Sequence, residues 1–187
     1  MYTLPDHTME FIPCKAELAS PTTDRDTTWQ LVRLQGLGPE HTSFLWKLVH
    51  LLLPIKERIH RLSPTTSPLC TMCNDNMIES LHQTFNSYSH NNGAGPALVA
   101  VLRNYMPTIN MEKIMRLEFN DLEEDMEFPT VWFTAAFLLA IWEHRQSGTR
   151  IRCYEIRAEI EGKISLLRET RFPDHVKKLK LLRRNIE

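Results

Sequence analysis

An uninterrupted apolar run, VWFTAAFLLAIW, occupies positions 131–142 of this 187-residue chain. A helix that crosses a bilayer needs about 20 apolar residues, and this shorter run has Glu127 and Glu143 close to its ends. It is therefore expected to form a buried helix of a soluble protein, from about Pro129 to Gln146, with Gly148 as its C-terminal cap. This buried helix constrains the fold more than any other part of the sequence.

Residues 150–170 repeat apolar side chains at helical spacing, with Glu and Lys at i,i+4 positions on the opposite face. The apolar stripe consists of Cys153, Ile156, Ile160, Ile164 and Leu167. Two long helices joined by a short Gly turn are expected to form an antiparallel hairpin. The C-terminal helices would also support a homo-oligomer if the core leaves one of their apolar faces uncovered.

The first half of the chain carries shorter helical patterns that are interrupted by proline. Apolar residues recur at helical spacing after Pro39 and stop at Pro54, and a second short helix is expected over residues 55–62. Further helices are expected over 77–85 and around 97–105, and no stretch shows the alternation of a strand. The sequence predicts a mainly α fold: a small helical domain with a Cys-x2-Cys knuckle, followed by the long antiparallel hairpin.

Three regions follow from the composition along the chain. Residues 1–28 are rich in Thr, Pro, Ser and Asp and form a loose lead-in. Residues 29–108 carry the proline-interrupted helices and the cysteine pair. Residues 109–187 combine an acidic linker, the apolar helix, the amphipathic helix and a basic tail.

Charge and cysteine content narrow the class of protein. The 22 Lys and Arg against 23 Asp and Glu give a net charge of −1, which argues against a strongly basic nucleic-acid coat. The 4 cysteines are too few and too scattered for a disulfide-stapled secreted domain. The N-terminus lacks the pattern of a secretory signal, so the chain is expected to be cytoplasmic or nuclear, not secreted, with reduced thiols and no membrane contact.

Cys70-Thr71-Met72-Cys73 is the one motif with metal-ligand spacing. Two thiolates at this spacing can reach a single zinc ion, which needs two further N or S ligands. The downstream candidates for those ligands are His82 and His90. Two other interpretations remain open: the cysteines are ordinary half-buried residues, or they form a redox disulfide, although no βαβ pattern surrounds them.

A family resemblance rests on three segments: FLWKLVHLLLPIKERIHR at 44–61, the Cys70-x2-Cys73 pair, and Glu79-Ser80-Leu81-His82. Together they resemble the zinc-binding region that follows the reverse transcriptase domain in non-LTR (LINE-type) retrotransposon polyproteins, over about residues 29–95. The resemblance implies a Cys/His zinc site and a role in gripping template RNA or target DNA.

The match departs from the family pattern at the metal site. Aligned on Glu79, the family's histidine falls on Gln83 and its last cysteine on Tyr88. His82 lies one position early, and on a helix one position rotates a side chain by about 100°. The inherited metal site is therefore expected to be degenerate.

The predicted nucleic-acid contacts are basic residues around the cysteines: Lys47, Lys56, Arg58, His60 and Arg61. Catalysis is not expected, because the chain lacks the Tyr/Phe-x-Asp-Asp turn of a reverse transcriptase, a phosphate-binding loop and any recognisable small-molecule site. The leading interpretation is a non-catalytic, retrotransposon-derived fragment that binds RNA or DNA weakly. The alternatives are a helical dimerisation module without nucleic acid or metal, and a decayed reading frame with no role.

Overall fold

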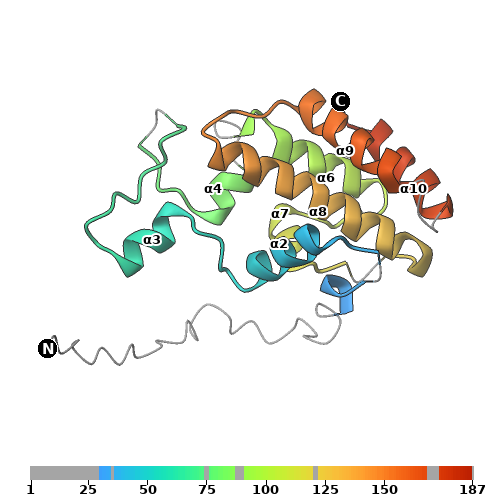
Figure 1. The fold of residues 1–187 in the computed structure, drawn as a ribbon, viewed down its shortest axis with the longest axis horizontal. Coiled ribbons are helices and arrows are strands. Elements are labelled where there is room, and N and C mark those ends of the chain that lie inside the picture. Colours follow the sequence, from blue (N-terminus) through green and yellow to red (C-terminus); the bar gives the residue numbers. More distant parts are fainter. Residues whose placement is uncertain are drawn as a thin grey trace, which may run out of the picture.

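A computed structural model of the chain describes residues 30–34, 36–73, 76–86, 91–119, 122–167 and 173–186. These residues are mainly helical, which confirms the predicted fold class, and their only β pairing is an isolated antiparallel bridge between Leu69 and Ile78. Figure 1 labels the helices in chain order. They are α2 (Pro39–Val49), α3 (Lys56–Leu62), α4 (Leu81–Asn86), α6 (Ala94–Arg103), α7 (Met111–Arg116), α8 (Glu124–Gln146), α9 (Cys153–Leu167) and α10 (Pro173–Arg184).

Helix α8 is the centre of the core and contains the apolar run 131–142. It packs against α2, α4, α6, α9 and α10, and every side chain from Phe128 to Trp142 is buried. A helix that is apolar all round is stable only when neighbours cover all its faces, and these five helices do so. None of the helices described by the structure has the length and apolar content that a membrane span requires.

Helix α8 begins at Glu124, five residues before the predicted start at Pro129. Proline has no N–H and so cannot donate to the carbonyl four residues earlier, which belongs to Asp125. Lys178 of α10 replaces that donor: its Nζ lies 2.9 Å from the Asp125 carbonyl oxygen and also pairs with the Asp125 carboxylate. The prediction failed because this partner lies 53 residues away along the chain.

Helices α9 and α10 both pack against α8 and against each other. The predicted stripe on α9 is directed into this core, with Ile156, Ile160 and Ile164 buried, and α10 buries three apolar residues of its own. Gly148 has φ +70°, the left-handed conformation expected after a helix end. The buried apolar residues of α9 and α10 are therefore covered within one chain, whereas Tyr154, Leu166 and Leu181 on the same two helices face solvent.

A glycine sets the distance between α4 and α6. A Cβ atom at Gly95 would lie 1.7 Å from the carbonyl oxygen of Phe85, so no other residue fits there without moving α4. Asn91 completes the same junction, because its Nδ2 donates to the Phe85 carbonyl oxygen at 2.8 Å.

His41 lies in the interface between α2 and α8. It is buried, and its ring centroid lies 5.5 Å from that of Trp132. Burial lowers the pKa of His41, the positive charge of Lys163 lowers it further, and Glu40 acts in the opposite direction. The folded chain therefore favours neutral His41.

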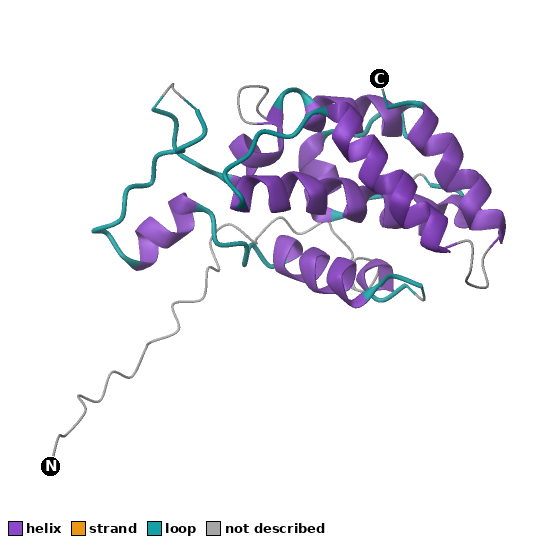
Figure 2. Ribbon diagram, turned by 45° about the horizontal axis from the view of Figure 1, so that its top comes forward, coloured by secondary structure: helices purple, strands orange, loops and turns teal. Residues whose placement is uncertain are grey.

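One part of the chain stands apart from the bundle. Helix α3 and the loop after it lie at one end of the molecule in both Figure 1 and Figure 2. Helix α3 buries none of its side chains. We call residues 51–80 the α3 lobe.

Candidate functional site

The cysteine pair lies in a closed loop of the α3 lobe. The Leu69–Ile78 bridge closes this loop, and the Cys70 N–H donates to the Met77 carbonyl oxygen at 2.8 Å. Within the loop, the Met72 N–H donates to Cys70 Sγ at 3.3 Å. Both cysteines are buried and carry thiols rather than a disulfide.

Gln83, on α4, faces this loop. Its Nε2 lies 2.7 Å from Cys73 Sγ, and both side chains are buried. The position of Gln83 on α4 is fixed at the start of the helix, where its backbone N–H donates to Ser80 Oγ at 3.1 Å. The structure therefore brings together Cys73 and Gln83, the residue with which the sequence alignment pairs the expected histidine ligand.

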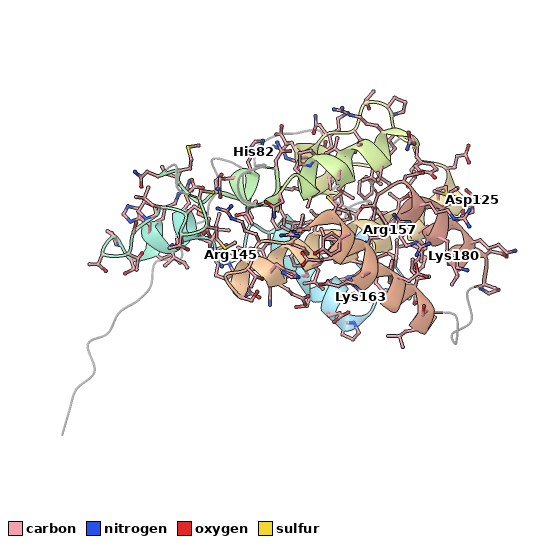
Figure 3. All side chains as sticks on the ribbon, turned by 90° about the horizontal axis from the view of Figure 1, so that it is seen from above. His82, Asp125, Arg145, Arg157, Lys163 and Lys180 are labelled. Atoms are coloured by element: carbon pink, nitrogen blue, oxygen red, sulfur yellow. The ribbon has the colours of Figure 1, made fainter. Side chains whose placement is uncertain are left out.

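The predicted histidine ligands are not placed with the cysteines. His82 is exposed on α4, where its Nε2 lies 2.9 Å from Asn86 Nδ2 (Figure 3). The one-residue offset predicted from the sequence explains this, because Gln83 occupies the inward position. His90 and Tyr88 lie outside the described residues.

The donor set of the loop does not fit a four-ligand zinc site. A zinc centre of this type needs four N or S ligands, and here the described residues offer two thiols and a carboxamide whose N–H points at sulfur. No group of three or more His, Cys, Asp or Glu side chains suited to a metal exists among the described residues. Zinc binding stays a prediction, and it would need ligands from outside the described residues.

A buried ion pair that sequence reasoning missed attaches the α3 lobe to the bundle. Glu79 is 1% exposed and pairs with Arg145, which is 14% exposed. The Glu79 carboxylate also accepts the backbone N–H of Lys56 at 3.2 Å, and Arg145 Nη2 lies 3.4 Å from the Pro54 carbonyl oxygen. Figure 3 shows Arg145 at the end of α8 that faces the lobe.

A second arginine supports the same attachment. Arg150, in the turn after α8, donates from Nη2 to the Met72 carbonyl oxygen at 2.7 Å. Neither arginine stands in a motif, and their partners lie 66 and 78 residues away in sequence.

The predicted nucleic-acid contacts collect on α3 and on the end of α2. Three of them also have partners within the lobe: Arg58 donates to the Leu51 carbonyl oxygen, His60 Nδ1 lies 2.7 Å from the Thr66 carbonyl oxygen, and Arg61 pairs with Glu57 at 2.7 Å. Lys47 is exposed in the last turn of α2, next to Trp46, which is 42% exposed.

Apolar side chains also face solvent on this part of the molecule. The most exposed is Leu62, at 78%. Besides Trp46, the others are Leu51, Ile59, Leu69, Met77 and Ile78. Beside Trp46 lies an open hollow of about 580 Å³, which is lined by Val32, Arg33, Leu37, Pro39, Thr42, Ser43 and Trp46. Such a mixture of apolar and basic side chains on one end of a molecule is typical of a binding surface.

Comparison of the chain with protein-family models, with curated proteins and with solved structures finds no match.

Proposed function

We propose that this chain is a non-catalytic, retrotransposon-derived module that binds single-stranded RNA or DNA weakly through the α3 lobe and the end of α2. The observation that supports this proposal is the placement of α3. This helix projects from the bundle, buries none of its side chains and carries Lys56, Arg58, His60 and Arg61. Lys47 adds a further exposed positive charge in the last turn of α2.

The basic residues of this region and the exposed indole of Trp46 are suited to binding single-stranded nucleic acid. Residues 44–80, which comprise the end of α2 and the α3 lobe, contain four Lys and Arg against three Asp and Glu, and one of these three, Glu79, is paired with Arg145. The whole chain has a net charge of −1. Phosphates are attracted to such a positive region, and an exposed indole such as Trp46 can stack on a base of any identity. About three phosphate contacts would give a salt slope of about −2 for a single strand.

Fluorescence anisotropy with short labelled single strands, measured over a series of salt concentrations, tests this proposal. The Lys47→Ala/Lys56→Ala variant is expected to weaken binding about tenfold and to reduce the salt slope by about 1.4. The matched control is Lys177→Ala/Lys180→Ala, which removes the same charge from α10 and should bind as the wild type does. The absence of binding at low salt, or binding that does not depend on salt, would refute the proposal.

The exposed aliphatic side chains favour a second candidate function, a protein-interaction module that joins two copies of the chain. Leu62, Met77 and Ile78 offer nothing to a phosphate backbone, but they would be buried in a dimer. Sedimentation at increasing concentration tests this candidate, with Leu62→Ser/Met77→Ser as the variant that should stay monomeric. A wild-type chain that is monomeric at every concentration would exclude it.

A further inference from the structure

The buried contact between Gln83 and Cys73 occupies the place where the family resemblance puts a metal–ligand bond. Gln83 Nε2 lies 2.7 Å from Cys73 Sγ. An amide nitrogen bears two hydrogens and no lone pair for a metal, so its role beside the sulfur is that of a hydrogen-bond donor. The donor stands on a helix whose start is fixed by Ser80, so its direction is well defined.

Backbone and side-chain groups close the cysteine loop on its other sides. The Cys70 N–H donates to the Met77 carbonyl oxygen at 2.8 Å, and the Glu79 N–H donates to the Pro68 carbonyl oxygen at 3.0 Å. Arg150 donates to the Met72 carbonyl oxygen at 2.7 Å, between the two cysteines. The groups that a metal would normally hold together are thus joined by hydrogen bonds to the rest of the chain.

We propose that the Cys70–Cys73 loop keeps its conformation without a metal ion, because the Gln83 amide holds Cys73 against α4, and that one substitution, Gln83→His, converts the loop into a Zn²⁺ or Co²⁺ site. An imidazole at position 83 starts from the same backbone position that directs the amide to Cys73. Two thiolates and one imidazole make three protein ligands, and water completes the tetrahedron.

His82 provides the matched control. It is adjacent in sequence, but it is exposed and contacts Asn86 instead of the cysteines. If the wild-type chain held zinc through its natural histidines, His82→Gln would lower its zinc content. If the proposal is correct, His82→Gln leaves the metal content of the wild type and of Gln83→His unchanged.

The experiment uses the full chain, purified with a phosphine reductant and with zinc in the growth medium. Three readouts are taken: metal per chain by mass spectrometry, the melting temperature with and without chelator, and the near-ultraviolet thiolate-to-Co²⁺ absorption during a Co²⁺ titration. The wild type should hold far less than one zinc per chain, and its melting temperature should not move with chelator. Gln83→His should bind about one Co²⁺ per chain, and its melting temperature should rise with added metal, because the ion binds only the folded state.

Two further variants keep the proposal testable if Gln83→His folds poorly. Gln83→Met preserves volume but removes the donor, and should lower the melting temperature by about 2–4 °C in the absence of any metal. Cys73→Ser in the Gln83→His background should abolish the Co²⁺ absorption.

Three results would overturn the proposal. The first is a wild-type chain with about one zinc whose melting temperature falls in chelator. The second is a Gln83→Met variant as stable as the wild type. The third is a folded Gln83→His variant that binds no Co²⁺.

Discussion

The attachment of the α3 lobe should depend on the buried pair between Glu79 and Arg145. Replacing Arg145 by Met keeps most of the side-chain volume but leaves the Glu79 carboxylate, which is 1% exposed, without its counter-charge. Breaking a buried ion pair from one side typically costs 3–5 kcal/mol. Glu79 retains one donor, the Lys56 N–H at 3.2 Å, so we expect a loss of about 2–4 kcal/mol in the free energy of unfolding.

The loss should be concentrated in the lobe. Arg145 also reaches the Pro54 carbonyl oxygen at 3.4 Å and lies 4.8 Å from the centroid of the Trp142 ring, so the variant loses these two contacts as well. Hydrogen exchange should therefore quicken at lobe amides such as those of Glu57 and Cys70 more than at amides of α8. Urea unfolding measures the total loss in the free energy of unfolding. The same substitution, Arg145→Met, should lower the melting temperature by about 5–15 °C.

Two comparisons make the prediction specific. Arg152→Met removes an exposed arginine close to the same turn and should change stability by less than about 0.5 kcal/mol. The double variant Glu79→Leu/Arg145→Met removes both charges and should recover most of the loss, because a buried pair replaced by apolar residues is often neutral. A loss below about 1 kcal/mol for Arg145→Met, or a double variant less stable than the single one, would refute the reasoning.

Three further predictions concern the bundle. Gly95→Ala should cost more than about 4 kcal/mol in the free energy of unfolding or prevent folding, because the new Cβ would meet backbone of α4. Gly162→Ala, whose new Cβ meets open space on α9, should instead gain about 0.5–1 kcal/mol in urea unfolding. Equal effects of the two substitutions would contradict the close approach of α4 and α6. Because burial lowers the pKa of His41 below 6.5, the unfolded chain binds a proton there more readily than the folded chain. The free energy of unfolding should therefore fall as the pH drops from above 6.5 through the folded pKa. His41→Phe should make the free energy of unfolding depend less steeply on pH in this range. An unchanged pH dependence in this variant would contradict its assignment to His41. Lys178→Met should cost about 1–2 kcal/mol, because it removes the donor that replaces the N–H of the proline in α8. The exposed Lys177→Met, which loses only a surface pair, should cost close to zero, and similar losses for the two lysines would refute the special role of Lys178.

Sequence periodicity located most of the helices but not their junctions. It missed α7 (Met111–Arg116), which lies in the stretch predicted to be an acidic linker, and the helix predicted over 77–85 begins only at Leu81, because Ile78 pairs with Leu69. The apolar run 131–142 and the stripe through Ile160 are local patterns, and both are buried as expected. The start of α8 depends on Lys178, and the attachment of the lobe depends on Arg145, which lies 66 residues from Glu79. No periodicity reports such distant polar partners, because a lysine or arginine that pairs inside the fold looks the same in sequence as one that faces solvent.

In the candidate site, too, the sequence indicated candidate residues but not the polar contacts between them. Spacing identified Cys70 and Cys73, and the alignment on Glu79 placed the family's histidine at Gln83, while His82 and His90 were the candidate ligands. Neither could show that the glutamine there contacts Cys73, because the direction of its amide depends on how α4 begins and on how the loop closes. The basic residues chosen as nucleic-acid contacts stay a prediction, and their partners within the lobe were not predictable from composition.

The dependence of α8 on α10 has a consequence for how the protein is made. Lys178 follows Asp125 by 53 residues, and the apolar side chains of α10 cover a face of α8. A ribosome delivers α8 first, so this most apolar helix leaves the exit tunnel before its last covering helix has left it. During that interval its uncovered face is available to chaperones and to other nascent chains. A premature stop codon within α10 is therefore expected to yield an aggregating polypeptide rather than a shorter folded one, which solubility after expression of such a truncation would show.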